Sequence, residues 1–149
     1  LPIFTGYAAS VEEEMKIAKA TAKLTYAFAN ATVPKVNLIV GKAYGSAYVS
    51  MNSKHIGADM VFALPNTVIA TMDSNLAAQI VYSDEDKDVI KDKALEYADL
   101  NSSINSAARR GYVDSIIEAD TVRKHMIYSF EMLFTKRESR PDKKHGSLL

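Results

Sequence analysis

Apolar residues recur at helical spacing in the first part of the chain. A helix is expected over residues 11–31, because six apolar positions lie three or four residues apart and so share one face. These positions are Val11, Met15, Ala18, Ala22, Tyr26 and Ala29. Several are small enough for close packing, so we expect this face to lie in the core. Pro34 ends the pattern because proline cannot continue a helix.

Short apolar runs then alternate with helical ones. Strands are expected at residues 36–40, 60–64, 68–72 and 112–117, and helices at residues 47–56, 74–82, 89–100, 102–109 and 121–136. The first two strands are separated by one helix, which is typical of a βαβ unit. The pattern therefore predicts a single α/β domain.

The junction between the first strand and the next helix is the most informative part of the sequence. A turn of small residues around Gly45 joins the two elements. The first N–H groups of a helix have no partner within it, so they can face a ligand above the turn. We therefore expect an oxyanion site built from main chain rather than from a catalytic side chain.

Composition excludes several kinds of protein. The 149 residues carry a formal net charge of zero and include no cysteine. Balanced charge disfavours nucleic acid and anionic membranes as partners. The lack of cysteine excludes disulfides, thiolate nucleophiles and cysteine metal sites. No apolar run approaches the roughly 18 to 20 residues needed to cross a bilayer, so we expect a cytoplasmic protein without membrane insertion.

Side-chain catalysts are scarce. Ser46, His55 and Asp59 are the only close Ser/His/Asp set. Ser46 and His55 lie near opposite ends of the turn and expected helix, roughly 13 Å apart at about 1.5 Å per residue. That distance is too long for a hydrogen bond, so a serine hydrolase is disfavoured.

Other charged groups favour structural roles. The acidic run at residues 83–88 lacks the central glycine of a calcium loop, so we expect a solvated loop and no metal. His125 and His145 are expected at the surface. Arg109 and Arg110 could bind a phosphate or a carboxylate, although an exposed helix end is favoured. The basic tail at residues 136–146 is more typical of disorder than of a docking extension.

Motifs spread over the whole chain carry a family resemblance. They include Lys42-Ala43-Tyr44-Gly45-Ser46-Ala47-Tyr48 and Arg110-Gly111-Tyr112-Val113-Asp114, together with residues 31–36, 51–63, 131–137 and 143–146. These segments resemble the carboxyltransferase subunits of biotin-dependent acyl-CoA carboxylases and decarboxylases, of the propionyl-CoA carboxylase β and methylmalonyl-CoA decarboxylase α type. Leu1-Pro2 resembles the opening of their C-terminal domain. The resemblance implies that residues 1–149 are that domain, a fragment of a longer subunit without its N-terminal domain.

The family resemblance implies a fold and a reaction. The fold is the crotonase-like ββα spiral of the α/β class. The activity is carboxyl transfer between carboxybiotin and the α-carbon of a short-chain acyl-CoA such as propionyl-CoA or methylmalonyl-CoA. Biotin is the cofactor and is carried on a separate carrier protein or domain. The implied partners are the biotin carboxyl carrier protein, the N-terminal domain, the acyl-CoA and further copies in a homo-oligomer, and the isolated domain is expected to be inactive.

The resemblance implies roles for particular residues. Tyr44, Gly45, Ser46 and Ala47 match the biotin-side site, where the backbone N–H groups of Ser46 and Ala47 stabilise negative charge on the ureido oxygen as the carboxyl group leaves N1′. The released biotin then takes the proton from the α-carbon. Val49 matches a wall of the acyl pocket.

Two positions depart from the family pattern. Glycine is common where Ser46 stands, and a Gly-Pro-Glu-Gly-like turn is common at Met72-Asp73-Ser74-Asn75. Two alternative functions stay open. One is a crotonase-fold acyl-CoA hydrolase or isomerase that uses the same N–H pair. The other is a non-catalytic domain that docks the carrier and orders the assembly.

Overall fold

The computed structural model describes residue 7 and residues 10–141, apart from the side chains of residues 12 and 13. The main elements are α1 (Val11–Asn30), β1 (Val36–Ile39), β2 (Lys42–Tyr44), α2 (Gly45–Ser50), β3 (Met60–Ala63), β4 (Val68–Ala70), α3 (Ser74–Val81), α4 (Lys87–Tyr97), α5 (Ile104–Arg109), β5 (Ser115–Ile116) and α6 (Val122–Met132). Short 3₁₀ turns lie at Lys54–Ile56 and Ala119–Thr121, and a π-helical turn lies at Ala98–Ser102. The opening Leu1-Pro2 and the end of the tail, with His145, lie outside the described residues.

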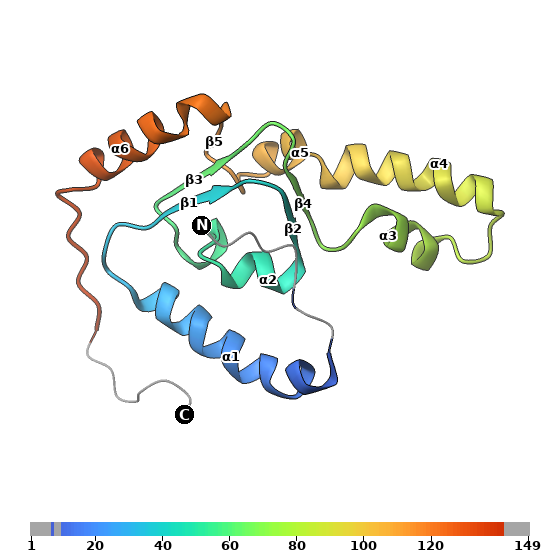
Figure 1. The fold of residues 1–149 in the computed structure, drawn as a ribbon, viewed down its shortest axis with the longest axis horizontal. Helices are drawn as coiled ribbons and strands as arrows, with labels where there is room; N and C mark the ends of the chain where they lie inside the picture. Colours follow the sequence, from blue (N-terminus) through green and yellow to red (C-terminus); the bar gives the residue numbers. More distant parts are fainter. Residues whose placement is uncertain (1–6, 8–9, 142–149) are drawn as a thin grey trace.

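Two small parallel sheets organise these elements. One sheet has the order β1-β3-β5, and the other pairs β2 with β4 (Figure 1). Val36 is aligned with Met60 in the first sheet, and Tyr44 with Ala70 in the second. The chain thus repeats a unit of two strands and a helix, first as β1-β2-α2 and then as β3-β4-α3. The prediction of an α/β fold with a parallel βαβ arrangement is confirmed.

The helix expected over residues 47–56 is only partly confirmed, because residues 47–50 are helical and residues 54–56 form a separate 3₁₀ turn. The chain has a strand at β2 that the apolar pattern did not reveal, and α2 begins at Gly45 and ends at Ser50. Asn52 then takes a φ of 58°, which asparagine tolerates better than most residues and which breaks the helix. The Asn37 side-chain amide donates to the Asn52 carbonyl at 2.9 Å and holds this turn against β1.

The core lies where the sheets meet α2 and α5. Its buried residues come from segments far apart in sequence: Ile39, Ala43, Tyr48, Ala58, Val61, Ala63, Ile69, Ile104, Ala107 and Val113. The strand expected over residues 112–117 contributes only β5, because the Tyr112 N–H still bonds back to Ala107 at the end of α5. His125, expected at the surface, is half-buried with its ring edge against Phe62.

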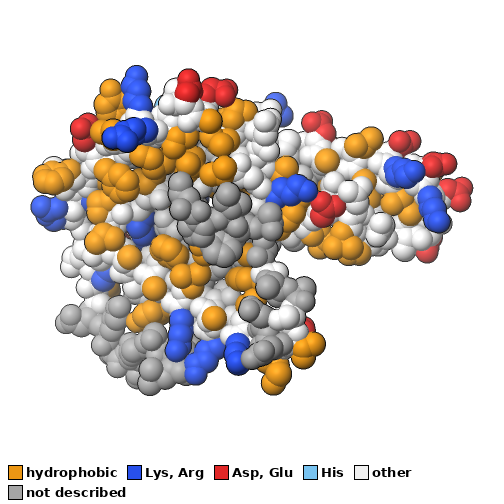
Figure 2. Space-filling view, in the orientation of Figure 1, with side chains coloured by type: hydrophobic (Ala, Val, Ile, Leu, Met, Phe, Trp, Pro, Cys, Tyr) orange, Lys and Arg blue, Asp and Glu red, His pale blue; other side chains and the backbone are white. Residues whose placement is uncertain are grey.

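Two apolar helix faces are not covered within the described residues. Val11 and Met15 are 79% and 84% exposed, so the predicted core face of α1 is wrong for its first half. Only the second half of α1 is partly buried, where it packs on α2. On α6, Ile127 and Phe130 are exposed, and hydrophobic side chains gather over this helix in Figure 2. These faces lack partners among the residues that the structure describes.

Helices α3 and α4 pack on each other and project from the body as an arm (right in Figure 1). The acidic run at the tip of the arm is exposed, as expected. Across the residues with described positions, no group of three or more His, Asp or Glu side chains could hold a metal ion. In the same residues, no helix combines the length and apolar character needed to cross a membrane.

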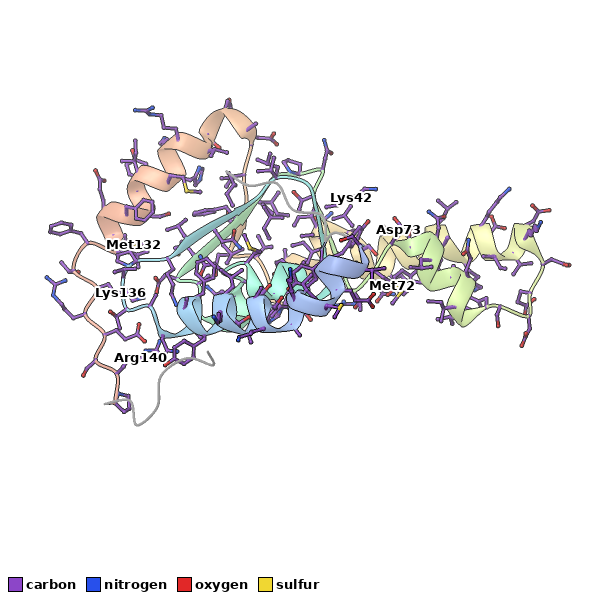
Figure 3. The ribbon with its side chains drawn as sticks, turned by 60° about the horizontal axis from the view of Figure 1, so that its bottom comes forward. Lys42, Met72, Asp73, Met132, Lys136 and Arg140 are labelled. Atoms are coloured by element: carbon purple, nitrogen blue, oxygen red, sulfur yellow. The ribbon has the colours of Figure 1, made fainter. Side chains whose placement is uncertain are left out.

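An ionic cluster fastens the segment after α6 to the start of β1. Lys136 is only 14% exposed and donates to both carboxylate oxygens of Asp59, at 2.8 and 2.9 Å. The Lys35 backbone N–H donates to the same carboxylate at 2.7 Å. Burial raises the pKa of Asp59, but the hydrogen bonds from Lys136 and Lys35 outweigh burial and hold that pKa below its usual value. Lys136 therefore belongs to the folded body, beside the segment that runs on to Arg140 (Figure 3).

Replacing Asp59 should destabilise the fold. Asp59→Ala removes the acceptor of the Lys35 N–H and the two shortest contacts of the Lys136 ammonium, and we expect the free energy of unfolding to fall by about 2 to 3 kcal/mol. Asp88→Ala is the matched control, because Asp88 is 98% exposed and meets Lys91 only at 4.0 Å. Urea unfolding of both variants measures the difference. Equal effects would show that the Asp59 cluster contributes no more than a surface ion pair.

Candidate active site

The start of α2 depends on one glycine. Gly45 takes a φ of +55°, and a Cβ atom built there would lie 3.1 Å from the Thr71 carbonyl oxygen. Glycine alone avoids both the strain and the contact. Tyr44 precedes the helix and provides no side-chain cap. By helix geometry the N–H groups of Ser46 and Ala47 have no acceptor inside α2, so they are available to a ligand.

Asp73 connects this turn to the equivalent turn in the second unit. Its carboxylate accepts the Asn75 backbone N–H at 3.0 Å, which caps α3, and the Tyr44 hydroxyl at 3.3 Å. Burial, followed by the charge of Asp73, raises the pKa of Tyr44. Figure 3 shows Lys42 near Met72 and Asp73 at this junction. Although Met72-Asp73-Ser74-Asn75 departs from the family pattern, α3 still has a capped N-terminus, and Asp73 adds a hydrogen bond from Tyr44 to the candidate site.

A cavity of about 400 Å³ lies beside the start of α2. Gly45, Ser46 and Val49 line one side, and Tyr97, Asn101 and Arg110 are among the residues that line the rest. The Ser46 side chain is exposed. Ala47 is buried, and it lines a second, smaller cavity of about 260 Å³ between α1, β1 and α2. Of the predicted site residues, three thus line the larger cavity, whereas Tyr44 and Ala47 do not.

A histidine lies between two tyrosines in the cavity wall. The ring of His55 makes edge contacts with Tyr112 at 4.7 Å and Tyr48 at 5.9 Å between ring centres. Burial, together with the nearby Tyr112, raises the pKa of Tyr48 to about 12, so this phenol keeps its proton at neutral pH. Within the described part of the chain the Tyr48 hydroxyl has no hydrogen-bond partner.

The Ser/His/Asp set is only partly brought together. Ser46 and His55 line the same cavity, because α2 ends early and the chain turns back at Asn52. The straight-helix separation predicted for them therefore does not apply. Asp59 is held by Lys136 and does not line this cavity. The structure thus provides no carboxylate partner for His55 from this set.

Sequence reasoning missed much of the cavity wall. Tyr97, Asn101 and Tyr112 were not predicted as site residues. Arg110 lies at an exposed helix end, as predicted, and it also lines the cavity. The motif that contains Arg110 and Tyr112 was recognised, but a motif alone does not place side chains in a cavity. Their position follows from the packing of the π-helical turn Ala98–Ser102 and α5 against β4.

Comparison with known proteins identifies the family. A family model described as the carboxyl transferase domain matches residues 4–148. The chain belongs to this family. The carboxyl transferase domain thus accounts for nearly the whole sequence, including both repeated units and the cavity between the arm and α2.

Relatives and solved structures agree with this assignment. The chain is 46% identical to methylmalonyl-CoA decarboxylase subunit alpha of Propionigenium modestum, over 85% of this chain and 26% of the relative. It is 43% identical to the propionyl-CoA carboxylase carboxyltransferase subunit of Haloferax mediterranei, over 92% of this chain and 28% of the relative. A solved structure of transcarboxylase 12S, described as a hexamer with hydrolysed methylmalonyl-coenzyme A bound, superimposes with a TM-score of 0.90 at 37% identity. It covers 96% of this chain and 29% of that one. The carboxyl transferase segment described here spans under a third of these relatives.

A side chain at Gly45 should disturb the start of α2. Gly45→Ala places a Cβ atom against the Thr71 carbonyl in a left-handed conformation, and we expect the free energy of unfolding to fall by about 1 to 3 kcal/mol. Gly41→Ala is the control on the neighbouring turn, since a Cβ there meets nothing within 4 Å. Thermal and urea unfolding compare the two. An equal stability for both variants would contradict the proposed constraint.

Proposed function

We propose that this chain is the C-terminal carboxyltransferase domain of a biotin-dependent acyl-CoA carboxylase or decarboxylase. Its reaction moves a carboxyl group between carboxybiotin and the α-carbon of a short-chain acyl-CoA. The observation that carries the proposal is the family match over residues 4–148, together with a cavity that Gly45, Ser46 and Val49 line at the start of α2. The repeated strand-strand-helix units support a crotonase-type spiral, the fold that the resemblance implies.

The start of α2 fits the ureido group of biotin. Gly45 leaves backbone instead of a side chain at the turn, and Ser46 opens onto the cavity. The N–H groups of Ser46 and Ala47 would donate to the ureido oxygen where negative charge develops, and a fixed donor in such a place is worth about 3 to 4 kcal/mol. Biotin, brought by its carrier, supplies the carboxyl group and afterwards a base for the α-proton.

The cavity wall is consistent with chemistry that needs no acidic side chain. Among the described residues, no aspartate or glutamate lines the cavity. Tyr48 stays protonated, because its pKa is raised to about 12. Val49 would bound the acyl group, as expected from its place in the family motif, and Ile69 adds apolar surface nearby. The protein's part is then to orient the reactants and to stabilise charge.

The proposed partners are an N-terminal carboxyltransferase domain, a biotin carboxyl carrier protein and further subunits. The exposed apolar faces of α1 and α6 support this, since large exposed apolar patches commonly mark interfaces. The relatives are also more than three times the length of this segment.

A hydrolase is the second candidate, and one observation favours it. Ser46 and His55 line the same cavity, although no hydrogen bond between their side chains is present in the structure. In that reaction the Ser46 hydroxyl would attack the thioester, and His55 would accept its proton. The two functions differ in which part of Ser46 matters: the backbone N–H in carboxyl transfer and the hydroxyl in hydrolysis.

Removing one backbone donor should abolish most activity. In the chain co-expressed with an N-terminal carboxyltransferase domain, Ala47→Pro deletes an N–H within the first turn of α2, where proline is tolerated. We expect kcat for biotin-dependent decarboxylation of methylmalonyl-CoA to fall roughly 100- to 1000-fold. Circular dichroism checks that the variant is folded.

Variants of Ser46 provide the controls. Ser46→Ala and Ser46→Gly keep the N–H and should retain activity within a few-fold. Full biotin-dependent activity in Ala47→Pro would contradict the main-chain mechanism. Thioester cleavage that is independent of biotin and lost in Ser46→Ala would favour the hydrolase instead. Binding of a biotinylated carrier without turnover would indicate a docking domain.

Charging the exposed face of α6 should weaken assembly. Phe130 is half exposed on that face, so Phe130→Glu should change the folded chain little. It should lower the mass of the assembled protein, because a charge would be buried without a partner at an interface. Lys124→Glu, an exposed change on the same helix, is the control. Light scattering after size exclusion measures the mass, and identical masses would show that this face is not an interface.

A further inference from the structure

Arg110 occupies a distinctive position in the cavity wall. It follows the last residue of α5, and Gly111 then turns the chain with a φ of +77°. The Gly111 N–H bonds to the Ala108 carbonyl at 3.0 Å, which closes the helix end and directs the next residues across the cavity. Arg110 and Tyr112 consequently line the cavity on either side of this turn.

The charge of Arg110 is not neutralised by the residues that the structure describes. Its Nη2 atom donates to the Asn101 side-chain oxygen at 3.1 Å and to the Leu100 carbonyl at 3.5 Å, both neutral acceptors. Described carboxylates pair with Lys54, Lys91, Lys93, Lys136 and Arg140, but none pairs with Arg110. The described lining also includes no acidic side chain and no second arginine or lysine.

This arrangement favours a carboxylate as the ligand. The contact to Asn101 holds one edge of the guanidinium, and the Nη1 and Nε donors have no acceptor among the described residues. A guanidinium with unsatisfied donors and no paired carboxylate attracts an anion, and a carboxylate would accept a charge-assisted hydrogen bond from one of these donors. Val49, Ile69, Tyr97 and Tyr112 surround the site with apolar and aromatic surface, which suits a small organic acid.

We propose that Arg110 binds the carboxylate that is transferred, either on the alkylmalonyl thioester or on carboxybiotin. This inference rests on the proposed function, because that reaction brings a carboxylate to this cavity both before transfer, on the donor, and after transfer, on the acceptor. Asn101 is then a positioning residue, since it holds the guanidinium without contacting the ligand. Arg110 thereby distinguishes the carboxylated ligand from its uncarboxylated form, whereas the Ser46 and Ala47 N–H groups would donate to the ureido oxygen.

The test compares Arg110 with its neighbour. Arg110→Gln, Arg110→Lys and the control Arg109→Gln are made in the chain co-expressed with an N-terminal carboxyltransferase domain. Arg109 is exposed and lies outside the described cavity lining. Calorimetry measures the dissociation constants of methylmalonyl-CoA and propionyl-CoA, and kinetics give KM for carboxybiotin in transfer to propionyl-CoA.

Loss of the guanidinium should weaken the binding of carboxylated ligands only. We expect Arg110→Gln to raise the dissociation constant of methylmalonyl-CoA, or KM for carboxybiotin, by roughly 10- to 100-fold. Propionyl-CoA binding should be unchanged, Arg110→Lys should recover part of the effect, and Arg109→Gln should match the parent. The ligand whose binding is weakened is the one whose carboxylate Arg110 contacts.

Other results overturn the proposal. If methylmalonyl-CoA and propionyl-CoA bind equally more weakly, Arg110 contacts the CoA portion or stabilises the fold. If neither dissociation constant changes and KM for carboxybiotin is also unchanged, Arg110 binds neither carboxylate. Failure of the proposed function is seen separately, as absence of biotin-dependent turnover in the parent protein. The calorimetric comparison still decides the role of Arg110 in that case.

Discussion

The close approach of Gly45 to the end of β4 is the constraint on which the candidate site depends. Parallel pairing aligns Tyr44 with Ala70, so α2 must begin directly over the strand end that carries Thr71. A left-handed residue without a side chain is the simplest way to make that turn. Once α2 begins there, Gly45, Ser46 and Val49 line one cavity. The chemistry at this site is therefore a consequence of how two strands pair.

Substitution of the family's usual residues has been accommodated by new contacts. Asp73 stands where glycine and proline are common, and it caps α3 while accepting the Tyr44 hydroxyl. A capped helix N-terminus is thereby kept, and the residue that precedes α2 gains an additional anchor. The exposed Ser46 side chain meets the cavity.

Packing is uneven along the chain. The two sheets, α2 and α5 enclose a continuous core, whereas the first half of α1 and the outer face of α6 leave large apolar side chains exposed. Buried ionic contacts fasten the outer segments instead, as Lys136 does at Asp59. The chain spans under a third of the transcarboxylase 12S chain on which it superimposes.

The amino-acid sequence by itself determined the α/β class, most element positions and the turn at Gly45, because apolar spacing, proline and glycine act locally. Family motifs added the expected reaction and the pair Ser46 and Ala47. Only the tertiary structure decided that the helix after the turn ends at Ser50, that half of the α1 stripe is exposed and that His55 shares a cavity with Ser46. It also brought Arg110 to that cavity, where no described carboxylate pairs with it. These features depend on contacts between segments distant in sequence, and local patterns carry no information about which distant surfaces meet.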